Sequence, residues 1–140
     1  MTETQVSDIT VGSSDCDALG HVNVARYFAF CNLNGIAMQT AMGFPPGEAH
    51  EGLRLSFAVV QMDSEFKAEL LAGERIRVHT NIAQIGTKSA TFRNWITRED
   101  GSVAFYSEWK SACLNLDTRR AHDIPDAFRN ALMRFLTPAV

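Results

Sequence analysis

Hydrophobic and polar residues alternate along much of this chain, which is the pattern of half-buried β-strands. Residues 6–12 show the pattern weakly. In residues 55–59 and 75–82 apolar side chains occupy every second position. Residues 91–97 and 103–113 are rich in aromatic and β-branched residues, which favour strands. The pattern predicts about five strands.

One long segment breaks the alternation. Residues 24–42 contain no proline and a single glycine, and they are apolar on nearly every side of a helix. Such a segment predicts a helix that is buried over most of its circumference. Gly43 and the pair Pro45 and Pro46 end it. A shorter amphipathic helix is expected over residues 125–136, with Pro125 in its first turn.

The order of elements is therefore a strand, a long helix, four strands and a short helix. The four strands are expected to form a meander, and Asp100 with Gly101 favours a hairpin between the last two. An antiparallel sheet that curls around the long helix would bury it. We predict an α+β fold with residues 1–140 as a single domain.

Composition narrows the classes of partner. The chain has 140 residues and a net charge of −3, without a basic stripe, so we expect no nucleic acid partner. Residues 27–47 carry no charge, but asparagines, glycines and prolines interrupt them, so we expect a buried helix and no membrane partner. Three cysteines without a CxxC pair, and no secretory signal at the start, favour reduced thiols and a cytoplasmic protein.

Polar residues gather in the turn before the long helix: Asp15, Asp17, His21 and Asn23. Such residues commonly cap helices, and this interpretation stays open. The alternative is a functional site, because an acid, an imidazole and an amide are grouped beside the free N–H groups of a helix start.

Residues 15–27, with the sequence D-C-D-A-L-G-H-V-N-V-A-R-Y, resemble the D-x-D-x-x-G-H-V-N-x-x-x-Y signature of hot-dog-fold thioesterases of the 4-hydroxybenzoyl-CoA thioesterase type. Turns at Gly73, Gly86 and Asp100 also fall where such sequences place them. The resemblance implies a hot-dog fold, in which a curved sheet wraps a long central helix, and a protein that hydrolyses acyl-CoA.

The resemblance assigns roles residue by residue. Asp17 matches the catalytic carboxylate, as nucleophile or general base. Val24 matches the position whose backbone amide polarises the thioester carbonyl. His21 and Asn23 match residues that orient substrate or water, and Tyr27 matches an aromatic that either contacts substrate or packs in the core.

The chain also departs from related patterns. Leu19 stands where plant acyl-carrier-protein thioesterases carry an asparagine, and Val24 replaces the second asparagine of the frequent H-V-N-N form. Both changes leave Asp17 with fewer polar partners. Asp15 is expected to be structural and to bond turn amides.

Lys88 and Ser89 resemble the turn that lies beside CoA in the family. Arg119 and Arg120 form another basic spot. Gln61 or Asp63 is expected to face the site of a partner subunit.

Other chemistries lack their motifs. There is no G-x-S-x-G element, no Gly-rich phosphate loop and no metal-ligand spacing among the four histidines, so we expect no metal and no cofactor. The sequence predicts a thioesterase acting on a fatty or aromatic acyl-CoA. The alternatives are a non-catalytic acyl-CoA or acyl-carrier-protein binding module and a hot-dog dehydratase or hydratase.

Assembly follows from surface patterns. The uncharged strand over residues 55–62 and an aromatic on the outer sheet face, Trp95 or Trp109, favour self-association. Related enzymes are homodimers or homotetramers with sites built from two subunits, so the resemblance implies the same here.

Overall fold

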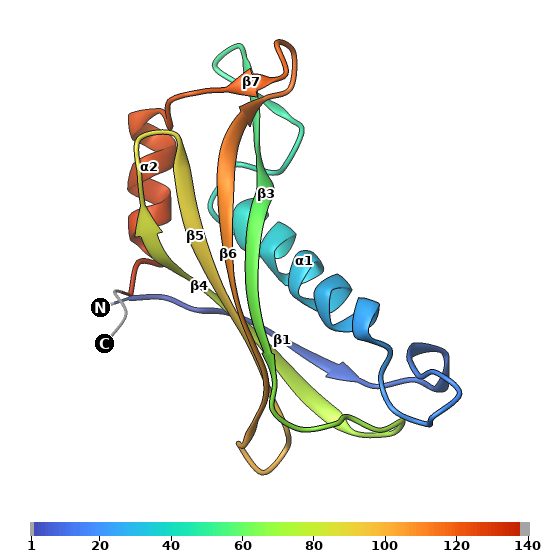
Figure 1. Ribbon diagram of the computed structural model, residues 1–140. Coiled ribbons are helices and arrows are strands. Elements are labelled where there is room, and N and C mark those ends of the chain that lie inside the picture. Colours follow the sequence, from blue (N-terminus) through green and yellow to red (C-terminus); the bar gives the residue numbers. More distant parts are fainter. Residues whose placement is uncertain (1, 138–140) are drawn as a thin grey trace.

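Five long antiparallel strands and one long helix make up most of the fold (Figure 1). The computed structural model describes residues 2–137. Its elements are β1 (Gln5–Thr10), η1 (Ser13–Asp15), α1 (Val24–Ala41), β2 (Ala49–His50), β3 (Leu53–Phe66), β4 (Arg75–Ile85), β5 (Ser89–Thr97), β6 (Val103–Asn115), β7 (Arg120–Ala121) and α2 (Asp126–Met133). The predicted α+β class and the curled sheet are confirmed. The two-residue strands β2 and β7 raise the strand number from about five to seven.

The strand order is β1-β4-β5-β6-β3-β2, and β7 pairs with β6. The predicted four-strand meander is therefore wrong at its first step, since β3 pairs with β6 and not with β4. The segment between β3 and β4 passes the start of α1, where Leu70 C=O accepts a hydrogen bond from Val22 N–H. This crossover leaves β4, β5 and β6 as a three-strand meander.

α1 packs against the concave face of the sheet through Tyr27, Phe30, Cys31 and Met38. Its apolar residues are not all covered, because Leu33 and Ile36 remain exposed. The sheet therefore covers one side of the helix and leaves an apolar strip on the other.

A β-bulge between Val59 and Gln61 changes which side chains of β3 face the helix. Before the bulge Phe57 packs inward, and after it Phe66 does, against Tyr27. Gln61 pairs with Lys110 and Asp63 with Glu108, which alternate away from the buried Trp109. Gln61 and Asp63 thus lie on the outer face, away from α1, and this position gives no support to the expectation that one of them faces a partner's site.

The two tryptophans lie on opposite faces of the sheet. Trp95 stacks on His79 on the outer face, with ring centroids 4.8 Å apart. Trp109 is buried on the side of α1, near Phe28. Of the two candidates for an outer aromatic, only Trp95 is one.

No helix formed by residues 2–137 is long and apolar enough to cross a membrane.

Candidate active site

The turn before α1 is held by Asp15. Its Oδ2 accepts a hydrogen bond from Gly12 N–H at 2.9 Å, and its Oδ1 accepts one from Arg26 Nε at 2.8 Å. Its backbone C=O accepts a further bond from Asn23 N–H. Both carboxylate oxygens are therefore engaged in positioning the turn, as expected for a structural acid.

Asp17 lies in different surroundings. Leu19 N–H donates to its Oδ1 at 2.9 Å, and its Oδ2 lies 3.4 Å from His21 Nε2. The Asp17 side chain is 32% exposed, so a substrate or water can reach the carboxylate. The other ring nitrogen of His21 lies 3.2 Å from Glu69 Oε2.

These contacts form a row of three titratable side chains, Asp17, His21 and Glu69. Glu69 was not singled out from the sequence, because it comes 48 residues after His21 and belongs to no local motif. The row holds the imidazole beside the Asp17 carboxylate.

The start of α1 offers a free donor. Asn23 is the N-cap, and its Oδ1 accepts a hydrogen bond from Ala25 N–H at 2.9 Å. Arg26 N–H donates to Asn23 C=O. The N–H of Val24 has no acceptor among residues 2–137, and Val24 is 59% exposed. A free amide at a helix start is suited to a carbonyl oxygen that gains negative charge.

Tyr27 lies deeper. It is buried, its ring meets Phe66 edge-on at 5.2 Å and Phe105 at 5.1 Å, and burial raises the pKa of its phenol. These contacts are those of a core aromatic, which was one of the two roles predicted for it.

Lys88 and Ser89 lie at the other end of the sheet. Lys88 Nζ is 3.9 Å from Asp123 Oδ1, and Ser89 begins β5. The turn that holds Asp17 follows β1, whose last residue, Thr10, pairs with Arg75 at the start of β4. Lys88 follows the other end of β4. At about 3.3 Å per residue this strand extends roughly 33 Å, so Lys88 lies about that far from the Asp17 turn. Figure 1 shows the turn between β4 and β5 far from the turn between β1 and α1, so a single chain does not bring Lys88 or Ser89 close to Asp17.

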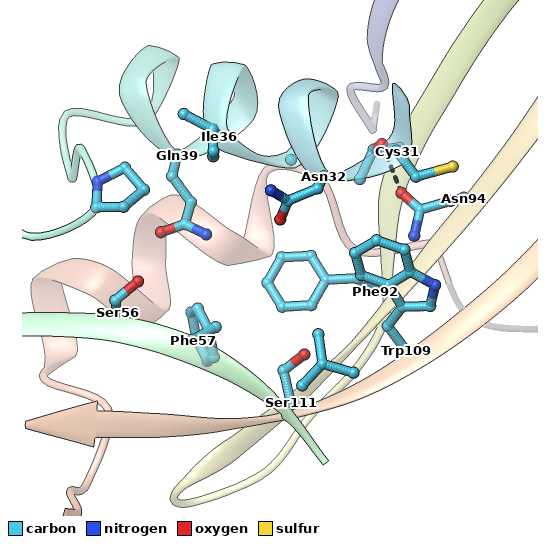
Figure 2. Close-up of a pocket in the computed structure, with 14 residues that line it drawn as sticks. Cys31, Asn32, Ile36, Gln39, Ser56, Phe57, Phe92, Asn94, Trp109 and Ser111 are labelled. Atoms are coloured by element: carbon cyan, nitrogen blue, oxygen red, sulfur yellow. Dashed lines mark hydrogen bonds between the residues drawn. The ribbon is translucent and has the colours of Figure 1, made fainter. Parts of the chain in front are cut away.

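A cavity of about 170 Å³ lies between the middle of α1 and strands β3, β5 and β6 (Figure 2). Aromatic rings of Phe57, Phe92 and Trp109 line it together with polar side chains, which are Asn32, Gln39, Ser56, Thr80, Asn94 and Ser111. Sequence reasoning missed this cavity, because its lining residues are spread between positions 31 and 111.

Within one chain, aromatic rings stand between this cavity and the start of α1. Phe28 contacts Phe105 and Trp109, and Phe66 contacts Tyr27 and Phe105. The ring centroids of neighbouring pairs are 5.0 to 6.4 Å apart. The cavity therefore does not open directly onto the Asp17 of its own chain.

Comparisons with known proteins agree with this architecture. Residues 11–132 match the Thioesterase-like superfamily. Among solved structures, a 1,4-dihydroxy-2-naphthoyl-CoA thioesterase from Synechocystis is similar, with 17% identity, a TM-score of 0.79 and coverage of 94% of this chain and 96% of that chain. A Staphylococcus aureus protein in complex with CoA has 18% identity, a TM-score of 0.84 and coverage of 100% and 90%.

A gentisyl-coenzyme A thioesterase is also similar, with 25% identity, a TM-score of 0.79 and coverage of 91% of this chain and 98% of that chain. A comparison with curated proteins gave no significant match. The superfamily match spans nearly the whole chain, and the fold is that of the similar thioesterase structures. This protein belongs to the thioesterase-like superfamily and is a hot-dog-fold thioester hydrolase.

Proposed function

We propose that the protein hydrolyses an acyl-CoA thioester to a free acid and CoA, with Asp17 as its catalytic carboxylate. The observation that carries this proposal is that one turn and the helix start that follows it present both a reachable Asp17 carboxylate and a free Val24 N–H. One group can activate water or attack the carbonyl carbon, and the other can stabilise the oxyanion that forms.

In the general-base route, Asp17 takes a proton from water as the water oxygen bonds to the thioester carbon. The carbonyl oxygen gains negative charge and accepts a hydrogen bond from Val24 N–H. The C–S bond then breaks, the acid leaves, and the CoA thiolate takes the proton. In the nucleophilic route, Asp17 itself bonds to the carbon and the C–S bond breaks, which releases the CoA thiolate. Water then cleaves the mixed anhydride, so that the acid leaves, the Asp17 carboxylate is regenerated and the remaining proton goes to the thiolate. His21 positions the Asp17 carboxylate in both routes, and Asn23 holds the helix start.

CoA is the thiol carrier that the similar structures favour. The Staphylococcus aureus protein is in complex with CoA, and two other similar proteins are named for aromatic acyl-CoA substrates. Lys88 and Ser89 would contact CoA in this proposal. They lie far from the Asp17 of their own chain, so they must act on the site of another chain.

We further propose a homodimer in which two β3 strands pair in antiparallel fashion. β2 covers β3 only at Leu53 and Arg54, so the edge of β3 over residues 55–66 is unpaired within the described chain. Val59, Val60 and Met62 on β3 are exposed, and the exposed Ile36 of α1 lines the same cavity as Val59. Long unpaired edges and apolar patches of this kind favour pairing with a second copy.

Antiparallel pairing would bring Lys88 and Ser89 of one chain toward Asp17 of the other. Tyr27, in the first turn of α1, packs on Phe66 at the end of β3, so the Asp17 turn lies near that end. Ser89 pairs with Ala112, which pairs with Ala58 in the first half of β3. Antiparallel β3 strands would set the Asp17 end of one chain against the Lys88 end and the cavity of its partner.

The three cysteines are free thiols, which supports a reducing compartment such as the cytoplasm.

Release of free thiol tests the function. The purified protein is incubated with a panel of acyl-CoA and acyl-carrier-protein thioesters, and free thiol is followed with a thiol-reactive dye. Hydrolysis of acyl-CoA supports the proposal. Faster hydrolysis of acyl-carrier-protein thioesters would show that the thiol carrier is acyl-carrier protein and not CoA. Binding without release indicates the binding module, and hydration of an enoyl-CoA without release indicates the hydratase.

A further inference from the structure

Glu69 lies beside the candidate catalytic turn because the backbone that follows it is fixed there. Figure 1 shows the segment that joins β3 to β4 next to the turn before α1. Val22 N–H donates to Leu70 C=O at 2.8 Å, and His21 and Leu71 form an isolated antiparallel bridge. The Leu70 side chain is fully buried. These contacts hold the preceding residue, Glu69, against the His21 ring.

Both ring nitrogens of His21 face a carboxylate, but the two contacts differ in length. Nδ1 lies 3.2 Å from Glu69 Oε2, and these two atoms form a hydrogen bond. Nε2 lies 3.4 Å from Asp17 Oδ2, which is longer than the usual N–H···O distance of about 2.7–3.2 Å. The hydrogen bond of the ring is therefore the one with Glu69.

This bond determines which nitrogen of His21 carries the proton. An ionised carboxylate only accepts hydrogen bonds, so Nδ1 must be the donor. In a neutral imidazole the other nitrogen is then an acceptor, and Nε2 presents its lone pair beside Asp17 Oδ2. The two neutral tautomers of an imidazole are close in free energy, so one charge-assisted hydrogen bond is enough to select between them.

The choice of tautomer matters for Asp17. The opposite tautomer would carry its proton on Nε2, 3.4 Å from Asp17 Oδ2, and would be able to donate a hydrogen bond to that oxygen. A carboxylate that accepts such a bond is a weaker base and a weaker nucleophile, because the bond already stabilises its negative charge. With the proton on Nδ1, the ring limits the movement of Asp17 by contact and leaves Oδ2 free to act.

We infer that Glu69 is a positioning residue, which fixes the His21 proton on Nδ1 and so keeps Asp17 Oδ2 free for the reaction. Glu69 touches no reacting atom and acts only through His21. The inference rests on the proposed function, in which Asp17 is the catalytic carboxylate.

Nuclear magnetic resonance of the imidazole nitrogens tests the inference without requiring turnover. The histidines of the intact protein are labelled isotopically, and the His21→Gln variant identifies the signals of His21. Spectra are compared at a pH where the signals show a neutral ring. We expect the proton on Nδ1 in the wild type and a shift toward the Nε2–H form in Glu69→Ala. A proton on Nε2 in the wild type, or the same tautomer in both proteins, overturns the inference.

Kinetics then connect the tautomer to the reaction. Glu69→Ala should lower kcat for an acyl-CoA by about three- to tenfold, the change that follows the loss of one ordinary hydrogen bond, and should leave KM unchanged. A change in KM alone would indicate substrate binding by Glu69 and would reject the positioning role. Because the Glu69 side chain is 66% exposed, the variant should keep its fold and melting temperature. Glu99→Ala, in the exposed turn between β5 and β6, is the matched control and should change neither kcat nor the His21 tautomer.

A double variant shows whether Glu69 acts through His21. In the His21→Gln background, Glu69→Ala should have no further effect on kcat, because the ring that Glu69 orients is gone. An equally large fall in kcat in both backgrounds would show that Glu69 acts independently of His21, which rejects the inference.

Thiol release from acyl-CoA separates this inference from the proposed function. Hydrolysis by a protein whose His21 carries the proton on Nε2 leaves the function standing and rejects the role of Glu69. A His21 proton held on Nδ1 by Glu69, in a protein that releases no thiol, retains the bond between these two residues and rejects the catalytic proposal.

Discussion

Asp15 and Asp17 lie two residues apart, yet their carboxylates have different partners. Both oxygens of Asp15 are bound, by Gly12 N–H and by Arg26, whereas Asp17 keeps one oxygen reachable beside His21. The backbone turn therefore separates a structural acid from a candidate catalytic one.

The structural role of Asp15 can be measured. Asp15→Asn should weaken the Arg26 contact and lower the free energy of unfolding by roughly 0.5–2 kcal/mol, the range for losing a capping interaction. Turnover should fall much less than in Asp17→Asn. Thermal melts and kinetics on the same sample check this, and a loss of turnover with an unchanged melting temperature would exchange the roles of the two acids.

His79 gives stability a pH dependence. Burial lowers the pKa of its imidazole and nearby Arg77 lowers it further, while Asp8 acts in the opposite direction. Below the unfolded pKa of about 6.5, the unfolded chain therefore binds a proton more readily than the folded one. Stability from this group is present above that pH and is lost as the pH falls toward the folded pKa.

Urea unfolding at pH 7.5 and pH 5.0 tests the His79 effect. The wild type should be less stable at pH 5.0, and His79→Gln should lose less stability between the two pH values. An equal loss in both proteins would show that other groups cause the dependence.

At the residue scale, the sequence predicted the polar turn and the helix start because they form a continuous segment. Residues that reach the site from distant elements carry no such local signal. Glu69, Gln39 and Asn94 belong to this second kind, since only the folded chain brings them beside His21 or into the cavity.

At the scale of elements, Asn34 docks α1 onto the sheet. Its side chain links the Ser7 hydroxyl of β1 to Thr80 of β4 from a position that is 1% exposed. An apolar replacement would leave the hydroxyl groups of Ser7 and Thr80 short of partners.

Asn34→Leu should therefore destabilise the protein by about 1–3 kcal/mol, the penalty for unpaired buried polar groups. Chemical denaturation measures the change. Asn130→Leu on the exposed side of α2 is the control and should change stability little. A neutral Asn34→Leu would show that Asn34 does not hold the helix in place.

The elements themselves were largely predictable, since the lengths of α1, β4, β5 and β6 follow the hydrophobic period. The pairing of β3 was not, because local pattern does not reveal which strand becomes its neighbour. The bulge between Val59 and Gln61 was also hidden, and it places Gln61 and Asp63 on the outer face of the sheet.

At the scale of the whole molecule, the unpaired edge of β3 makes association testable. Val60 is exposed at the bulge, and Val60→Glu would place like charges in a symmetric β3 contact. We expect dissociation to monomers and loss of activity, because Asp17 and Lys88 then belong to separate particles.

Sedimentation across a dilution series, with activity measured in parallel, follows both effects. Val103→Glu, on the strand β6, is the matched control and should leave assembly unchanged. A wild-type monomer with full activity would reject the two-chain site. A homotetramer remains the larger assembly predicted, and Trp95 with its strand neighbour Tyr106 on the outer face offers aromatic side chains for a second interface.

The most direct test of the catalytic proposal is thiol release from acyl-CoA by wild type and Asp17→Asn at equal concentration. An amide can neither accept the proton nor form the anhydride, so turnover should fall by at least about a hundredfold, at the lower end of the usual 10²–10⁴ effect of acid–base groups. Circular dichroism should show an intact fold, and Asp63→Asn on the outer face should retain turnover. Most of the activity remaining in Asp17→Asn would contradict the assignment of Asp17.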